Sequence, residues 1–422
     1  MKKIIFFLLI SYQTNAQTIF QKADSLVMIG DYQKAFLLLE KDNSFSSLNK
    51  SGNIYQQIGN YSKAINKYTK ALTIHSNLKT KENLGKCYQK NNHIDKAIIL
   101  FEEVLNEQIN NLLLKYHLAK LYKSKRAFSK AKILLKDLIN SDNENPNYYY
   151  YLGSIYSNLK QKDSAKIAFL KAVNLDSTHF KSLYKLSKLL RKESKYSLKK
   201  LPKKIRDLHK ANNDTSYYYL KKGLLIYPNS KALLQLAAKY NFKDEKHYKA
   251  IDYFNKIKVL KAEEQQNLAI SYFFIKDYEK AKDNLYKLID SRKAGSQTFY
   301  YLSLVYKAEK DYEKAELYMD FSIKEEQPQL APYYFELGLI HQEAKQYPKA
   351  IADFKQALKE DKYHYKSHYH LALLSDSYYK DKKIALKLYE GYLNKFIYRD
   401  KKITAFVKQR VKELKTKLFI DK

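Results

Sequence analysis

Residues 149–169 read YYYLGSIYSNLKQKDSAKIAF. In this stretch Gly153 is followed three residues later by Tyr156, and Ala165 is followed four residues later by Phe169. Apolar spacings of three and four place side chains on one face of a helix, and a small residue lets a second helix come close. The stretch therefore predicts two antiparallel helices packed against each other.

The same pattern of a small residue, an aromatic residue and an alanine recurs with a period of about 34 residues. The recurring alanines are Ala35, Ala64, Ala97, Ala131, Ala165, Ala250, Ala281, Ala315, Ala350 and Ala385. A small residue precedes most of them by twelve positions, and a large apolar residue follows four positions later. A single hairpin of helices cannot bury its apolar face alone, so successive hairpins are expected to stack into an array.

The step between Ala165 and Ala250 is 85 residues, which accommodates two periods of 34 and 17 extra residues. We interpret it as a further, interrupted hairpin with Ser187 at the small position and Ser216 at the alanine position. The extra residues lie between about 194 and 211, where Pro202 blocks a continuous helix. After the last hairpin, residues 399–419 predict one amphipathic helix that covers the exposed end of the array.

This arrangement resembles the tetratricopeptide repeat family, whose pattern is W-x2-L-G-x2-Y…A-x3-F…P. The matching residues are Tyr149, Leu152, Gly153, Tyr156, Ala165 and Phe169 in one unit, Leu84, Gly85, Tyr88, Ala97 and Phe101 in another, and Leu337, Gly338, Ala350 and Phe354 in a third, in which His341 replaces tyrosine. The resemblance covers about residues 17 to 395. It implies an all-α fold, a right-handed α-solenoid of about eleven helix-turn-helix repeats with a C-terminal capping helix.

The predicted division of the chain follows from these patterns. It comprises a signal peptide (1–16), an N-terminal array (17–193), a basic insertion within an interrupted repeat (194–211), a C-terminal array (212–395), and a capping helix with a tail (396–422).

The first sixteen residues have the order of a cleaved secretory signal peptide. Lys2 and Lys3 precede an apolar run over residues 4–10, and Ala16 ends a polar stretch before Gln17. The run is too short to cross a bilayer, so we expect cleavage, export, and a soluble mature chain in the periplasm or outside the cell. Exported protein that still begins at residue 1 would contradict this prediction.

The composition excludes several classes of function. The closest glycines, Gly52 and Gly59, are seven residues apart, too far for a dinucleotide fingerprint, a Walker loop or a nucleophile elbow. The single cysteine, Cys87, excludes an internal disulfide and multi-cysteine metal sites. No nucleophile is paired with a base in the pattern, so we expect no enzymatic activity and no cofactor.

The formal net charge of +34 comes from 78 Lys and Arg residues against 44 Asp and Glu residues, and only six of the basic residues are arginine. Lysine lacks the planar fork with which arginine reads guanine and phosphate. The surplus therefore favours nonspecific attraction to anions, or it reflects the codon bias of an AT-rich genome. Nucleic acid is not an expected partner, because an exported chain rarely meets it.

The resemblance also implies a partner-binding groove. In the family, the first helix of each unit lines the groove with the residues three before, one after and four after its small position. These positions give a basic and aromatic half and an apolar half, namely Lys86, Tyr116, Lys120, Lys123, Tyr150, Tyr184, Lys188, Arg191 and Lys239, then Ile270, Phe273, Tyr300, Leu304, Phe335, Leu339, Tyr369 and Leu373.

A protein or peptide with an acidic segment and an apolar segment would complement such a groove. The alternative is that the lysines only solvate the surface and the leucines pack inward. The leading hypothesis is thus an exported, non-catalytic scaffold.

A second hypothesis is an envelope protein that binds polyanions, such as lipid phosphate or glycan, through the lysine-rich groove and the insertion. The insertion contributes Lys195, Lys199, Lys200, Lys203, Lys204 and Arg206. Binding of this kind would depend steeply on salt. A solvated insertion without a binding role is the alternative for this segment.

Two smaller features have structural interpretations. His364 and His368 are four residues apart and His370 follows, so a helix would place the first two on one face, as a metal site requires. Because no cysteine can join them, we expect solvent-facing histidines and no metal. Cys87 precedes Tyr88 on a first helix and is expected to be a buried, inert thiol.

Overall fold

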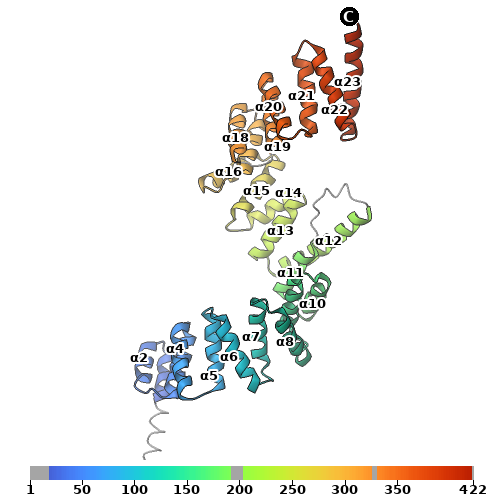
Figure 1. Ribbon diagram of the computed structural model, residues 1–422. Helices are drawn as coiled ribbons and strands as arrows, with labels where there is room; N and C mark the ends of the chain where they lie inside the picture. The colour runs from blue at the N-terminus through green and yellow to red at the C-terminus, as the bar shows by residue number, and fades with distance from the viewer. Residues whose placement is uncertain (1–18, 192–202, 326–329, 421–422) are drawn as a thin grey trace, which may run out of the picture. The chain divides into compact units, whose positions relative to one another are not determined.

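The computed structural model describes residues 19–191, 203–325 and 330–420, and the chain divides after Ile226 into two compact units (Figure 1). The predicted signal peptide and Lys195, Lys199 and Lys200 lie outside the described residues. Lys203, Lys204 and Arg206 fall within a described helix, but their side chains lie outside the description. No helix in the described ranges is both long enough and apolar enough to cross a bilayer.

The N-terminal unit is a row of helical hairpins. A helix over residues 19–28 pairs with α2 (Tyr32–Leu39), followed by α3 (Phe45–Gln57) with α4 (Tyr61–Ile74), α5 (Leu78–Lys90) with α6 (Ile94–Glu107), α7 (Leu112–Ser124) with α8 (Phe128–Ser141), α9 (Pro146–Asn158) with α10 (Lys162–Leu175), and α11 (Phe180–Leu190) with α12 (Lys203–Ile226).

The C-terminal unit continues the same arrangement. Its pairs are α13 (Lys231–Lys243) with α14 (His247–Asn255), α15 (Ala262–Phe274) with α16 (Tyr278–Asp290), α17 (Ser296–Ala308) with α18 (Tyr312–Glu325), α19 (Ala331–Glu343) with α20 (Tyr347–Glu360), and α21 (Tyr365–Tyr378) with α22 (Lys382–Phe396), and α23 (Lys401–Ile420) ends the chain. The described residues thus form eleven hairpins and one further helix, which confirms the predicted all-α repeat array.

The turn inside most hairpins is a left-handed helix ending. After α9, the N–H of Lys160 donates to the carbonyl of Ser157 (3.1 Å) and the N–H of Gln161 donates to that of Tyr156 (2.9 Å), the hydrogen-bond pair of a Schellman motif. The residue with positive φ is Gly30, Gly59, Asn92, Arg126, Lys160, Glu245, Lys276, Lys310 or Lys345. Glycine serves only the first two hairpins, so the later turns hold side chains in a conformation that favours glycine.

In four hairpins, a glycine on the first helix makes room for an aromatic ring from the second. A Cβ atom added at Gly153 would lie 2.8 Å from the ring of Phe169, and one at Gly338 would lie 2.6 Å from the ring of Phe354. Both rings are completely buried. The Phe354 ring also lies 5.7 Å from that of His370 in the next hairpin, so one side chain joins two successive repeats. This contact explains why the small and aromatic positions recur together.

The interrupted hairpin keeps the predicted register. Helix α12 begins directly after Pro202, and Ser216 within it is fully buried. The Ser216 hydroxyl donates to the carbonyl of Ser187, 2.6 Å away on α11. Ser216 therefore occupies the alanine position that the spacing predicts, with its hydroxyl satisfied by the backbone at the small position.

The final helix closes the C-terminal unit through buried side chains and one ion pair. Val407 and Leu414 of α23 are buried in a cluster with Tyr389 and other residues of α22. Arg410 of α23 binds both carboxylate oxygens of Asp376 on α21, at 2.6 and 3.2 Å. Such a bidentate pair fixes orientation as well as distance. The segment thus covers the last hairpin, as a capping helix should.

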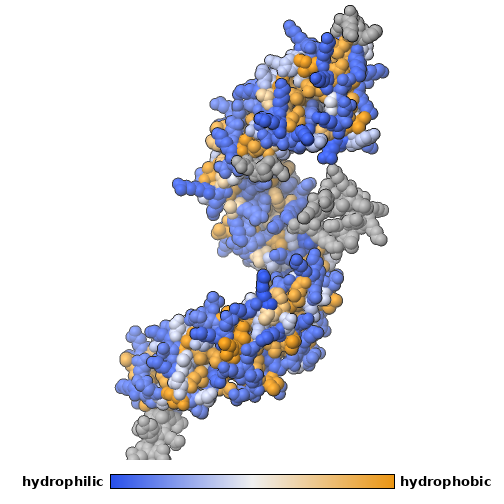
Figure 2. Space-filling model, viewed as in Figure 1, coloured by the Kyte–Doolittle hydropathy of each residue, from blue (hydrophilic) through white to orange (hydrophobic). Residues whose placement is uncertain are grey.

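Figure 2 shows hydrophilic side chains over much of the visible surface of both units, with apolar ones between them.

Candidate functional site

The first helices α7, α9 and α11 of the N-terminal unit carry a patch of lysine and tyrosine. We call it the lysine–tyrosine face and define it as Tyr116, Lys120, Lys123, Tyr150, Tyr151, Lys181, Tyr184, Lys185 and Lys188. Six of these residues were predicted as groove residues. Helices α7 and α9 contact each other directly, so side chains from successive repeats meet on this face.

The tyrosines form the platform of the face. The ring of Tyr116 on α7 packs at 5.4 Å from that of Tyr148 and 5.5 Å from that of Tyr151, both on α9, and Tyr150 packs at 5.1 Å from Tyr151. Burial raises the pKa of Tyr150 and Tyr151 above the usual value, so these hydroxyls stay neutral. Edge-to-face and tilted packing of this kind fixes the rings and gives the lysines a rigid support.

Four lysines lie over these rings. The Nζ of Lys120 is 5.2 Å from the ring centre of Tyr116, and that of Lys123 is 5.5 Å from Tyr151. From α11, Lys181 lies 5.7 Å from the ring of Tyr150 on α9, and Lys188 lies 5.6 Å from that of Tyr184. Cation–π contacts of this length hold the ammonium groups at defined positions. Lys123 from α7 and Lys181 from α11 therefore both lie over tyrosine rings of α9, the helix between them in the chain order of first helices.

The charges on this face are not neutralised. Within the described residues, Lys120, Lys123, Lys181, Lys185 and Lys188 have no carboxylate partner within ion-pair distance. Burial lowers the pKa of Lys120, and the neighbouring Lys181 and Lys90 lower it further. Burial and Lys185 do the same to the pKa of Lys123. Like charges that are partly removed from water disfavour one another, and a bound anion would relieve both costs, which makes this face a candidate site.

Other predicted basic residues have partners of their own. Lys86 lies 2.5 Å from Glu82, one turn earlier on α5, and the Glu82 carboxylate is only 8% exposed. The guanidinium of Arg191 lies over the ring of Tyr217 at 5.5 Å. Lys239 belongs to the C-terminal unit, where Glu263 is 4.0 Å away. These residues are engaged within the fold, so we leave them out of the lysine–tyrosine face.

Three residues of the face were missed by the sequence reasoning. Tyr151 and Lys185 each stand two residues before the small position of their helix, and Lys181 stands near the start of α11. The residue two before the small position and the residue one after it are three apart, so they lie on one face of the helix. The spacing rule used for the groove omitted this position, although the sequence contains the signal.

The predicted apolar half differs from the expectation. Ile270 and Phe335 are each 5% exposed and pack in the core, so they offer no accessible surface. The remaining predicted residues, Phe273, Tyr300, Leu304, Leu339, Tyr369 and Leu373, are half-buried. A charged group also lies here, because Lys307 on α17 is 3.7 Å from Glu336 and 3.3 Å from Glu343, both on α19. The surface is therefore less apolar than the sequence predicted.

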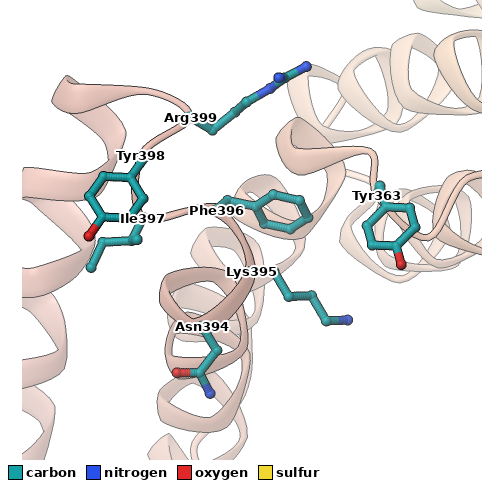
Figure 3. A pocket seen from close by; sticks show the side chains of 7 residues that line it. All are labelled: Tyr363, Asn394, Lys395, Phe396, Ile397, Tyr398 and Arg399. Carbon is teal, nitrogen blue, oxygen red and sulfur yellow. The ribbon is translucent and has the colours of Figure 1, made fainter.

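A cavity of about 540 Å³ lies near the end of the C-terminal unit. Tyr363, Asn394, Lys395, Phe396, Ile397, Tyr398 and Arg399 line it. Figure 3 shows Phe396 and Tyr363 extending on one side together with Lys395, whereas Ile397 and Tyr398 point the other way. Every polar side chain in this lining is exposed, and that of Tyr398 is 95% exposed. We therefore place the candidate site at the lysine–tyrosine face and not here.

The histidines and the cysteine have structural contacts. His364 Nδ1 lies 2.7 Å from the Ser367 hydroxyl, and His368 Nε2 lies 3.0 Å from the carbonyl of Lys362. Burial lowers the pKa of His370 to about 4, with help from nearby lysines. In the described ranges, no three His, Cys, Asp or Glu side chains are grouped as metal ligands. Cys87 is buried, and burial raises its pKa to about 11, which makes the thiol unreactive.

Comparison with known families agrees with this architecture. Residues 47–82, 146–179 and 331–364 each match a model of the tetratricopeptide repeat. The second and third of these ranges cover the hairpins that carry Phe169 and Phe354. No curated protein matches the sequence significantly.

Several solved structures are similar to the chain. Yeast Tom70 is 13% identical over 97% of this chain and 97% of its own, with a TM-score of 0.39. The C-terminal part of a TPR repeat-containing protein from Cytophaga hutchinsonii is 16% identical over 67% of this chain and 99% of its own, with a TM-score of 0.40. MamA from Desulfovibrio magneticus RS-1 is 15% identical over 44% of this chain and 97% of its own, with a TM-score of 0.37.

Proposed function

The chain belongs to the tetratricopeptide repeat family, and we propose that it is a non-catalytic scaffold that binds an acidic segment of a partner protein on the lysine–tyrosine face. Proteins of this fold typically serve protein–protein interaction. The observation that carries the proposal is the set of five lysines without a carboxylate partner in the described residues, held on a packed tyrosine platform.

The fixed position of the lysines favours a defined partner over diffuse attraction. A lysine on an open surface loses side-chain entropy when it pairs with an anion, which leaves little net gain. Here Lys120, Lys123 and Lys185 are half-buried, and the first two already lie against tyrosine rings. Part of the ordering cost has therefore been met during folding. The tyrosine hydroxyls and ring edges can contact the backbone of the same peptide.

Binding of an acidic peptide to the full chain tests the proposal. We expect a fluorescent peptide rich in glutamate to bind, and the variant K120E/K123E/K185E to lose about a hundredfold in affinity, since three attractive charges become repulsive. The matched control is K355E/K359E/K387E, which makes the same change in net charge at exposed positions on α20 and α22.

The control separates a site from general electrostatics. We expect the control variant to bind within about threefold of the parent, because charges beyond a Debye length of about 8 Å are screened at physiological salt. Equal losses in both variants would show that only net charge matters. Full affinity in K120E/K123E/K185E would exclude the lysine–tyrosine face as the site.

We further propose that the scaffold acts after export. The basic start, the apolar run over residues 4–10 and the small residue at Ala16 support this proposal. Protein recovered from the envelope or medium of its own cells should begin at Gln17. A cytosolic chain beginning at residue 1 would contradict it.

A further inference from the structure

Three isoleucines project from the second helices of the N-terminal unit. Ile99 on α6 is 55% exposed, Ile133 on α8 is 66% exposed and Ile167 on α10 is 68% exposed. Each stands two residues after the recurring alanine of its hairpin. We call these three side chains the isoleucine row.

The row faces away from the core and from the lysine–tyrosine face. Residues two apart on a helix point about 200° apart, so the residue two after a buried alanine points outward. Ala97, Ala131 and Ala165 are completely buried. The row is therefore on the solvent side of the second helices, whereas the lysine–tyrosine face is formed by first helices.

The repeat fold does not require isoleucine at this position. The corresponding residues in the C-terminal unit are Asp252, Asp283, Leu317, Ala352 and Lys387. Three exposed isoleucines in successive hairpins thus add nothing to the packing of the array. A β-branched apolar side chain that is more than half exposed carries a hydration cost that burial in another phase would remove.

Lysines predominate among the charged residues around the row. Two acids one turn beyond the isoleucines are neutralised from the first helices, Glu103 by Lys81 at 2.9 Å and Asp137 by Lys115 at 2.5 Å. Beside the row, Lys132, Lys136 and Lys166 have no ion-pair partner among the described residues. The three projecting isoleucines thus have lysines beside them, and Asp163, one turn before Ile167, is an exposed acid without an ion pair among the described residues.

We propose that the isoleucine row and its lysines bind the surface of an anionic lipid bilayer. Isoleucine side chains that project by more than half can enter the boundary between head groups and acyl chains, and lysines beside them meet anionic head groups. A second copy of the chain is disfavoured as the occupant, because two lysine-bordered faces would repel. A partner helix is disfavoured because it needs a recess, whereas these side chains protrude.

Sedimentation of the full chain with vesicles tests the proposal. The probes are vesicles of phosphatidylcholine with and without phosphatidylglycerol, at low and physiological salt. We expect binding only to the anionic vesicles. The variant I99S/I133S/I167S should lose about tenfold or more in partitioning at either salt concentration, and K132E/K136E/K166E should lose most at low salt.

A matched control uses exposed isoleucines outside the row. Ile29, Ile74 and Ile109 are 77%, 56% and 66% exposed, so I29S/I74S/I109S removes similar apolar surface and should bind vesicles within about twofold of the parent. The row variant should also keep its affinity for the acidic peptide, which separates this surface from the lysine–tyrosine face. A parent that ignores anionic vesicles, a row variant that binds like the parent, or a control that loses as much as the row variant would each overturn the proposal.

Discussion

The first helices of the two units differ in whether their lysines have carboxylate partners. In the N-terminal unit, the lysine–tyrosine face collects Lys120, Lys123 and Lys185 without a described carboxylate partner, and burial lowers the pKa of all three. In the C-terminal unit, Lys307 meets Glu336 and Glu343 of the next hairpin. The position four residues after the small residue thus holds Lys123, without a described carboxylate partner, in one unit and Lys307, in an ion pair, in the other.

The difference shows that the surface charges vary independently of the fold. Both units keep a fully buried ring against a glycine, Phe169 against Gly153 and Phe354 against Gly338. Because the two hairpins share this contact, it does not dictate the surface charge, and partial burial of unpaired lysines carries a cost in the folded state. Retaining such a cost is expected where a ligand relieves it.

The largest expected effect tests whether the interiors are equivalent. We expect F169A and F354A each to lower the free energy of unfolding of their own unit by about 3–5 kcal/mol, since each leaves a cavity between two helices. Guanidinium denaturation with hydrogen exchange as a local probe measures both. F274A, at a side chain that is 53% exposed, is the control and should cost less than about 1 kcal/mol. A marked difference between the losses in free energy of unfolding caused by F169A and F354A would show that the two interiors are not equivalent.

A smaller effect concerns a buried ion cluster that is particular to the C-terminal unit. His341 is 4% exposed and lies between Asp353 on α20 at 2.5 Å and Glu316 on α18 at 3.2 Å. Burial opposes its charge, but Asp353 and Glu316 together raise the pKa of His341 above the usual value. Lys349 also pairs with Glu316, and burial raises the pKa of the neighbouring Asp320. Protonated His341 therefore stabilises the unit.

The sign of the pH dependence follows from the raised pKa. The stabilisation is present below the unfolded histidine pKa of about 6.5 and is lost as pH rises through the higher folded value. Tyrosine stands at this position in most other hairpins, so H341Y is the reference that lacks the titrating group. We expect the free energy of unfolding of the parent to fall by about 1 kcal/mol relative to that of H341Y between about pH 6 and pH 8, because His341 loses its proton. Denaturation at both pH values measures it. If the difference in the free energy of unfolding between the parent and H341Y were the same at both pH values, the raised pKa of His341 would not contribute to stability.

The smallest expected effect concerns the turns inside the hairpins. Gly59 has φ of 79° in the N-terminal unit, whereas Lys310 has φ of 64° at the equivalent turn of the C-terminal unit. Because left-handed backbone disfavours a Cβ atom, K310G should raise the free energy of unfolding by about 0.5–1 kcal/mol. K355G, within helix α20, should instead lower it by about 1 kcal/mol. A loss of stability in K310G would mean that the lysine side chain contributes more than the turn costs.

Much of the fold could be predicted because its determinants are close together in the chain. The twelve-residue separation of small residue and alanine spans one hairpin, so it is visible without tertiary information. It even placed Ser216 correctly across an interruption, where the Ser216 hydroxyl reaches the Ser187 carbonyl at 2.6 Å. The left-handed turns were not predicted, since Lys160 and Lys310 replace the glycine that would have marked them.

The candidate site could be predicted only in part. Tyr116, Lys120 and Lys123 followed from the spacing rule, whereas Lys185 stands at a helix position that the rule omitted. Ile270 and Phe335 satisfied the rule but are buried, and Phe335 packs against Phe354 of its own hairpin and His370 of the next. The outward isoleucine row had no place in a rule written for first helices.

The amino-acid sequence by itself determined the number, order and register of the hairpins, because those depend on side chains that meet within a few helical turns. Only the tertiary structure decided which charges are neutralised. Lys307 and Glu336 are far apart in the chain yet pair across hairpins, while Lys120 finds no carboxylate among the described residues. Pairing depends on the reach of long side chains between stacked helices, and that geometry exists only once the helices are in place.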